Sequence, residues 1–252
     1  MEAGARLEQG VRLSLDENRA AGNDGVAQRP PVATLDSPAA GVRLWWCALH
    51  ATPWQLQSFA RVLSAGEHAR AARFGNALLR DRYVIGSAAL RTVLAAVLGV
   101  TPERVPIVRG TRGRPQLDRA ATLDFNVSHT GDVALIGVTR EGRIGVDIER
   151  GDRTINVAGI ARKFLTPAER DRLAALDSDA ARRDVLRLWT CKEAMSKATG
   201  DALSAPFAAI DVDLRDGQAL HDGPGKYRPA CWMLHAAPMP GDYLATIALW
   251  RA

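Results

Sequence analysis

The sequence predicts an α+β fold with two similar lobes, each a small, mainly antiparallel sheet packed on a long helix. Three observations indicate this class. Each half of the chain contains one long segment whose apolar residues recur at helical intervals and which ends at a glycine. Short runs rich in β-branched and aromatic residues accompany both segments. Polar turns between neighbouring runs are typical of antiparallel hairpins.

The long helix of the first half is predicted from Asn76 to Leu98, and Gly99 stands where it would end. Ahead of it, Ser64 and Glu67 form a capping-box pattern that predicts a short helix. Helical spacing predicts another helix over Trp54 to Leu63. The extended runs of this half are Val42 to Leu49, Val105 to Val108 and Leu123 to Val127, with a Gly- and Arg-rich loop at Gly110 to Pro115.

The second half repeats this order. A helix is predicted from Asn156 to Leu165, and Thr166 with Glu169 caps the next one. A long helix follows from Asp179 to Ala198 and stops at Gly200. The extended runs are Val133 to Val138, Ile144 to Ile148, Ala209 to Leu214, Cys231 to Ala236 and Tyr243 to Trp250, and the turn from Thr139 to Arg143 joins the first two into a hairpin.

Residues 1 to 41 are predicted to be a mobile extension. They are rich in Ala, Gly, Arg and Asp, contain Pro30 and Pro31, and lack a sustained apolar period. The N-terminal lobe is then predicted to cover residues 42 to 127 and the C-terminal lobe residues 128 to 252.

Composition narrows the class of protein. The 252 residues are 47% hydrophobic and 24% charged, and no apolar run is long enough to span a membrane or act as a signal core, so a cytoplasmic protein without membrane contact is expected. The formal net charge of +5 favours acidic or phosphate-bearing partners. Nucleic acid is not an expected partner, because the arginines are scattered and only 6% of the residues are aromatic.

Two carboxylates share one face of the predicted strand Ile144-Gly-Val-Asp-Ile-Glu149. Side chains alternate along a strand, so Asp147 and Glu149 point the same way, about 7 Å apart. This pattern fits either a solvated acidic face or a site for a hard cation such as Mg²⁺, which prefers carboxylate oxygens. Gly145 lies on the same face and would leave room for a ligand.

The segment Trp189-Thr-Cys-Lys-Glu-Ala-Met-Ser-Lys197 lies within the second long helix. Glu193 and Lys197 are four residues apart and could form a surface ion pair. They also continue a stripe begun by Val185 and Trp189, which should face the core. Charges in such a stripe need a partner, and a metal-bound phosphate would serve both.

Two further motifs are weaker. Ser128 and His129 end the strand Phe125-Asn-Val-Ser-His129 and could be an ordinary turn, since no Gly-x-Ser-x-Gly nucleophile elbow surrounds Ser128. In Gly113-Arg-Pro115, Arg114 could bind a phosphate or be a solvated loop residue.

In their order and spacing, these motifs resemble the signature blocks of the 4'-phosphopantetheinyl transferases, closest to the two-lobed type that activates surfactin synthetase. The similarity covers Val42 to Trp250. It implies a pseudo-twofold, monomeric transferase, a holo-[acyl-carrier-protein] synthase, that binds coenzyme A between its lobes and uses Mg²⁺. Such an enzyme moves the phosphopantetheine arm to a serine of an acidic apo acyl- or peptidyl-carrier protein in fatty acid, polyketide or nonribosomal peptide biosynthesis. The second product is adenosine 3',5'-bisphosphate.

The resemblance also implies a role for each motif residue. The metal ligands would be Asp147, Glu149 and Glu193. The coenzyme A contacts would be Lys192 and Lys197 at the pyrophosphate, Ser128 and His129 at a phosphate, Arg114 where relatives often carry Lys, and Arg70 and Arg82 near the adenosine 3'-phosphate. Glu193 and Lys197 would be the catalytic residues, with Lys197 stabilising phosphate charge.

Several alternatives stay open at this point. The acceptor of the serine proton is either Glu193, directly or through a water on the metal, or a hydroxide on the metal. A metal-dependent phosphodiesterase would use the same acidic face, and a non-catalytic basic protein would bind acidic partners without it. The sequence does not identify the carrier protein that is served.

Overall fold

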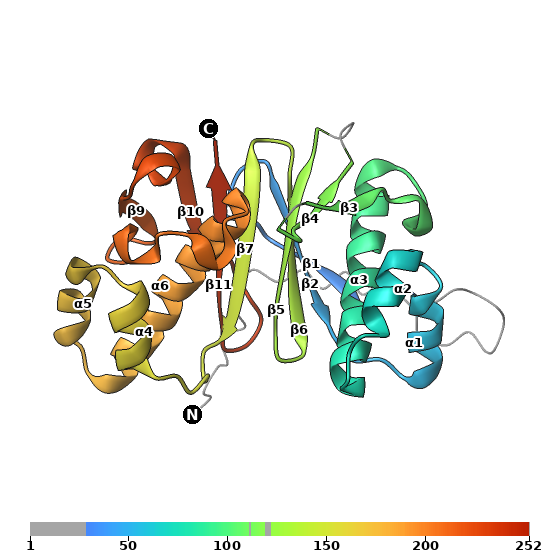
Figure 1. Ribbon diagram of the computed structural model, residues 1–252, viewed down its shortest axis with the longest axis horizontal. Helices are drawn as coiled ribbons and strands as arrows, with labels where there is room; N and C mark the ends of the chain where they lie inside the picture. Colours follow the sequence, from blue (N-terminus) through green and yellow to red (C-terminus); the bar gives the residue numbers. More distant parts are fainter. Residues whose placement is uncertain (1–28, 111, 119–121, 252) are drawn as a thin grey trace, which may run out of the picture.

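The computed structural model describes residues 29–110, 112–118 and 122–251. Two lobes lie side by side, and in each a 22-residue helix packs on an antiparallel sheet (Figure 1). This arrangement confirms the predicted α+β fold class. None of the described helices is both long enough and apolar enough to cross a membrane.

The N-terminal sheet has the antiparallel strand order β1-β2-β6-β5. Helix α3 covers one of its faces together with two short helices, α1 and α2. Asn76 caps α3 by accepting a hydrogen bond from the Leu79 N–H, and Gly99 ends the helix at φ 70°. The elements are β1 (Val32–Leu35), β2 (Val42–Ala48), β5 (Asp124–Thr130), β6 (Val133–Thr139), α1 (Pro53–Ala60), α2 (Ala65–Ala71) and α3 (Ala77–Leu98).

The C-terminal sheet has the antiparallel order β10-β11-β7 and packs on α6. Asp177 caps α6, and the predicted caps at Asn156 and Thr166 are confirmed. The elements are β7 (Arg143–Arg150), β10 (Trp232–Ala236), β11 (Tyr243–Trp250), α4 (Val157–Phe164), α5 (Pro167–Ala174) and α6 (Ser178–Thr199). Two ribbons complete the fold, β3 (Ile107–Arg109) with β4 (Pro115–Leu117) and β8 (Asp211–Asp213) with β9 (Ala219–Asp222).

A hydrophobic core shared by both sheets joins the lobes. It lies on the sheet faces opposite to the long helices and includes Leu44 and Leu135 from the first sheet and Ile247 from the second. The apolar residues of β7 that enter it are Ile144, Val146 and Ile148, all at most 1% exposed. The predicted alternation of β7 is therefore confirmed, and its acidic residues face the other way.

An ion pair recurs at the same place in both lobes, partly buried in the first and fully buried in the second. Glu67, in the capping box of α2, accepts from Arg91 Nε at 2.7 Å, and Glu169, in the capping box of α5, accepts from Lys192 Nζ at 2.7 Å. Arg91 and Lys192 each lie fourteen residues after the first residue of their long helix. The predicted similarity of the lobes thus extends to single residues.

Two predicted boundaries differ from the structure. Residues 32–35 are not part of an extension, because β1 pairs with β2, with Val32 opposite Cys47; residues 1–28 lie outside the described part. The predicted lobe boundary between residues 127 and 128 falls inside β5, which pairs with β6 as far as Thr130. The predicted hairpin of residues 133–138 with 144–148 is also wrong: the chain passes from one sheet to the other at the β6–β7 turn, so β6 pairs with β2 and β5 while β7 pairs with β11. These errors arise because the partner of a strand depends on contacts between residues that are distant in the sequence, which local residue patterns do not reveal.

Gly145 does not leave room for a ligand. A Cβ atom on Gly145 would lie 1.8 Å from the carbonyl oxygen of Ala194, so the glycine allows the backbone of α6 to approach β7. We expect Gly145→Ala to lower the free energy of unfolding by about 1–3 kcal/mol, the usual cost of overpacking. Urea denaturation followed by circular dichroism measures this.

Gly66→Ala is the matched control, because no atom lies within 4 Å of a Cβ placed there, on the short helix α2. This change should leave stability unchanged or slightly raised. Equal stabilities of the two variants would contradict the close packing of α6 on β7.

Candidate active site

The candidate site lies where β5 and β7, the facing edge strands of the two sheets, run side by side. Side chains of β5 take the place of a backbone partner for β7. Asp124 Oδ2 accepts from the Ile144 N–H at 2.8 Å, and Asn126 Oδ1 accepts from the Val146 N–H at 3.0 Å. The contacts advance by two residues along both strands, so the strands run parallel and Ser128 comes to face Asp147.

Asp147 is the centre of the site. Its side chain is 7% exposed, and its Oδ1 atom accepts from Ser128 Oγ at 2.8 Å and from Lys197 Nζ at 2.6 Å. Lys197 Nζ also donates to Ser128 Oγ at 2.8 Å. Asp147 Oδ2 is buried and has no hydrogen-bond partner among the described residues. A buried carboxylate oxygen without a partner is costly unless a ligand or ion satisfies it.

Glu149, two residues further along β7, is held from two sides. Thr130 Oγ1 donates to Glu149 Oε2 at 3.2 Å, and the Arg153 guanidinium forms an ion pair with Oε1. Burial raises the pKa of Glu149; the positive charge of Arg153 opposes this rise and the negative charge of Asp147 adds to it. Glu149 is therefore on the same face as Asp147 and close enough to interact with it electrostatically.

Glu193 comes to the same place from α6. Its carboxylate makes no hydrogen bond to another described residue. Burial first and the negative charges of Asp147 and Glu149 next raise the pKa of Glu193, while Lys197 opposes the rise. The structure thus brings the three predicted metal carboxylates and Lys197 together at the junction of the lobes.

His129 and Arg82 extend this cluster toward α3. Desolvation and then the positive charge of Lys197 lower the pKa of His129, and Arg82 and Asp147 act on the same ring. Arg82 Nε is buried without a hydrogen-bond partner among the described residues. The Arg70 guanidinium lies 5.8 Å from the ring centre of Tyr83, next to Arg82 in the chain. Arg70 and Arg82 therefore lie on the same side of the N-terminal lobe, and their contact with the adenosine 3'-phosphate stays a prediction.

Lys192 is not in the site, contrary to the prediction from the resemblance. Its side chain is 0% exposed and donates to Glu169 Oε2 and to the carbonyl oxygens of Phe164, Phe207 and Ile210, at 2.6 to 3.1 Å. Because its ammonium group is surrounded by these acceptors, Lys192 cannot contact a pyrophosphate in the site. The physical reason is helix geometry: Lys192 projects into the core of the C-terminal lobe while Lys197 projects toward β7.

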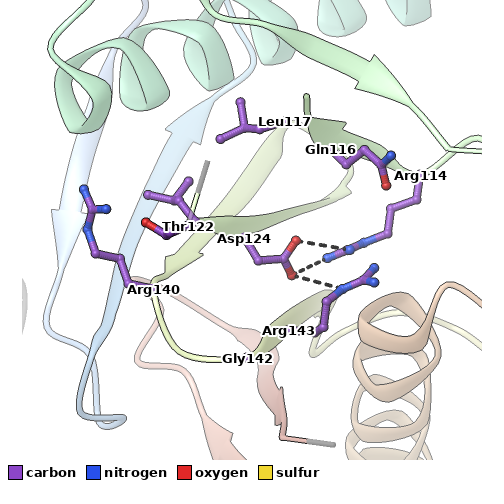
Figure 2. Close-up of a pocket in the computed structure, with 9 residues that line it drawn as sticks. Arg114, Gln116, Leu117, Thr122, Asp124, Arg140, Gly142 and Arg143 are labelled. Carbon is purple, nitrogen blue, oxygen red and sulfur yellow. Dashed lines mark hydrogen bonds and ion pairs between the residues drawn. The ribbon is translucent and has the colours of Figure 1, made fainter. Parts of the chain in front are cut away.

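Arg114 is neither a solvated loop residue nor free to bind phosphate with its whole guanidinium. Its side chain is 10% exposed, and its Nη atoms donate to both oxygens of Asp124, with one also reaching the Ile144 carbonyl oxygen at 2.7 Å. Figure 2 shows this pair beside Arg143. Arg114 therefore links the start of β5 to the start of β7 through hydrogen bonds.

The fit of a divalent cation can be judged from the donor set. The carboxylates of Asp147, Glu149 and Glu193 are the hard oxygen ligands that Mg²⁺ prefers, and Asp147 Oδ2 lacks a partner. No three acidic, His or Cys side chains of the described residues converge tightly enough to form a complete site. Like charges repel, and Lys197 and Arg153 each hold one carboxylate oxygen. The chemistry of the three donors therefore suits a divalent cation, while Arg153 occupies one oxygen of Glu149.

Sequence reasoning missed three residues that shape the site. Asn126 and Thr130 lie on the same face of β5 as Ser128, so continuing the strand alternation from Ser128 would have indicated both. Arg153 follows Glu149 by four residues, but it lies in a loop, where that spacing carries no geometric meaning. No sequence signal identified it.

Comparison with known proteins gives consistent matches. A family model described as the 4'-phosphopantetheinyl transferase superfamily matches residues 143–248, and one described as 4'-phosphopantetheinyl transferase, N-terminal, matches residues 48–140. The chain is 39% identical to the 4'-phosphopantetheinyl transferase HetI of Nostoc sp., over 74% of this chain and 78% of HetI. It is 26% identical to Sfp of Bacillus subtilis, over 76% and 84% of the two chains. It is 31% identical to AcpT of Escherichia coli, over 53% and 64%. These matches do not favour the phosphodiesterase or the non-catalytic alternative.

Proposed function

Since this chain belongs to the 4'-phosphopantetheinyl transferase superfamily and moves the phosphopantetheine arm of coenzyme A to a carrier protein, we propose that Asp147, Glu149 and Glu193 bind the divalent cation it uses. One observation carries the proposal. Asp147 holds Lys197 and Ser128 with one oxygen and presents the other, buried and unpartnered, beside two further carboxylates. Mg²⁺ is the cation proposed for this site, because carboxylate oxygens are the hard ligands that it prefers.

The reaction breaks a phosphoanhydride bond of coenzyme A and forms a phosphate ester with the carrier serine. The hydroxyl oxygen of the carrier serine attacks the phosphorus that bears the pantetheine arm, and the bond from that phosphorus to the bridging oxygen of the diphosphate breaks. Holo-carrier and adenosine 3',5'-bisphosphate are the products. When bound, Mg²⁺ supplies positive charge that stabilises the phosphate oxygens as negative charge develops on them.

Lys197 supplies a second positive charge at a fixed position. Its ammonium is held by Asp147 Oδ1 at 2.6 Å and by the Val146 carbonyl oxygen at 3.3 Å, while its side chain stays 26% exposed. A charge held in this way does not have to reorganise as the reaction proceeds. Ser128 and His129, beside it, complete the contacts to the diphosphate.

Glu193 is the acceptor of the serine proton in this proposal. Its carboxylate has no hydrogen bond to another described residue, so an oxygen that does not bind the cation is available to accept the proton. The carrier serine would donate its proton to Glu193 as the new ester bond forms.

The partner in this proposal is an acidic carrier protein. The net charge of +5 would draw such a partner toward the lobe junction and speed its association at low salt. The chain is proposed to act as a monomer, since one copy contains all the proposed site residues.

Intact-mass spectrometry of a purified apo-carrier incubated with this protein and coenzyme A tests the proposal. With Mg²⁺ the carrier should gain the mass of one phosphopantetheine arm, and a chelator should abolish the gain. A carrier whose acceptor serine is replaced by alanine is the control. No mass gain on several different carriers would contradict the function, whereas an unchanged gain in chelator would contradict only the cation site.

A further inference from the structure

A pocket rich in arginine lies at the opposite end of β5 and β7 from the acidic cluster. It has a volume of about 400 Å³ and lies between β4, the start of β5 and the β6–β7 turn (Figure 2). Pockets of this size hold small organic molecules. Its lining residues are Arg114, Gln116, Leu117, Thr122, Leu123, Asp124, Arg140, Gly142 and Arg143.

The charges of this pocket do not balance. Among the described residues that line it, three carry guanidinium groups and only Asp124 carries a carboxylate. Asp124 already accepts from Arg114 at 2.8 Å and lies 3.6 Å from Arg143 Nε. Arg140 makes no hydrogen bond or ion pair with the described residues, and Glu141, the nearest acid in the turn, pairs with Arg251. The pocket therefore keeps an excess of two positive charges.

Buried donors in the same pocket also lack acceptors. The Nε atoms of Arg114 and Arg143 are both buried without a hydrogen-bond partner among the described residues. Desolvation and then the charge of Arg114 lower the pKa of Arg143, so the two cations destabilise one another at this place. Arg114 is itself 10% exposed. An anion in the pocket would relieve the repulsion between the two guanidinium groups.

We propose that this pocket binds a small organic or inorganic oxyanion with several negative oxygens, of the phosphate or polycarboxylate class. The guanidinium groups of Arg140 and Arg143 bind either class through N–H donors, while Leu117, Leu123 and Thr122 contact the remainder of a larger ligand. The pocket is a second anion site, separate from the one used in transfer. Asp124 and Ser128, like Arg143 and Asp147, are four residues apart along their strands, which separates the two sites by about 13 Å.

Isothermal titration calorimetry at low ionic strength tests this, with inorganic phosphate and citrate as separate probes. The wild-type protein should bind at least one probe, and Arg140→Gln and Arg143→Gln should each weaken that binding at least tenfold. Arg61→Gln is the matched control, because Arg61 is an exposed arginine outside the pocket. Binding of phosphate alone assigns a phosphate site, and binding of citrate alone assigns a carboxylate site.

The measurements are repeated with the protein saturated with coenzyme A. Unchanged probe affinity supports a separate site, and loss of probe binding contradicts it. Equal affinities in the pocket variants and the wild type, or no binding of either probe, would also overturn the proposal. Arg140 has no partner to lose, so its variant keeps its fold, which thermal melting checks. The carrier assay with Arg140→Gln reports transfer independently and should show the wild-type rate.

Discussion

Asp147→Asn is expected to lower the rate of phosphopantetheine transfer about a hundred- to a thousandfold, the scale seen when a charge-stabilising group is removed from an active site. Asparagine keeps the shape of the side chain and can still accept from Ser128 and Lys197 at one atom. It removes the negative charge that holds Lys197 and replaces the unpartnered Oδ2 with an N–H₂ donor, which cannot bind a cation. Initial rates from intact-mass spectrometry of the carrier, with saturating coenzyme A and Mg²⁺, measure the change.

Asp152→Asn is the matched control for this experiment. Asp152 lies just beyond β7, is exposed, and pairs only with Arg150 among the described residues. Exposed ion pairs contribute little to stability, so the Asp152→Asn protein should stay folded and transfer at nearly the wild-type rate. A well-folded Asp147→Asn protein that kept more than a tenth of the wild-type rate would remove Asp147 from the proposed cation site.

Lys192→Met is expected to lower the free energy of unfolding by about 3–5 kcal/mol, the cost of breaking a buried ion pair by removing one partner. Methionine fills a similar volume, but it leaves the buried carboxylate of Glu169 without its cation. It also leaves the carbonyl oxygens of Phe207 and Ile210 without their donor. Urea denaturation followed by circular dichroism measures the loss.

Lys197→Met gives the reverse pattern and is the matched comparison within the same helix. Lys197 is partly exposed, so its removal should change stability much less while transfer falls sharply. If Lys192→Met were as stable as the wild type and only weakened coenzyme A binding, Lys192 would return to the pyrophosphate site that the family resemblance implied.

Features encoded by neighbouring residues could be predicted from the sequence. The caps at Asn76, Asn156 and Thr166 and the helix ends at Gly99 and Gly200 depend on contacts within one turn. The acidic face of β7 follows from strand alternation alone. For the same reason the predicted positions of the two long helices differ from the observed ones by at most a residue or two.

Lys192 was wrongly placed in the site because it is close in the sequence to Lys197. Lys192 and Lys197 belong to one short motif, but five residues at about 100° each place them roughly 140° apart around the helix. This angle can be calculated from the sequence alone, and it indicates that only one of the two lysines can face the site. The partners of Arg114 and Arg153 were not available, because they depend on how β5, β7 and the following loop meet in three dimensions.

The way in which β7 meets β5 has a consequence for association between molecules. An edge strand with free N–H and C=O groups invites an extended segment of another chain to add to the sheet. Here Asp124 and Asn126 take two amide protons of β7, while Arg114 and Lys197 donate to the carbonyl oxygens of Ile144 and Val146. The lysine that organises Asp147 therefore also helps to close this edge of β7 against the addition of a strand from another molecule.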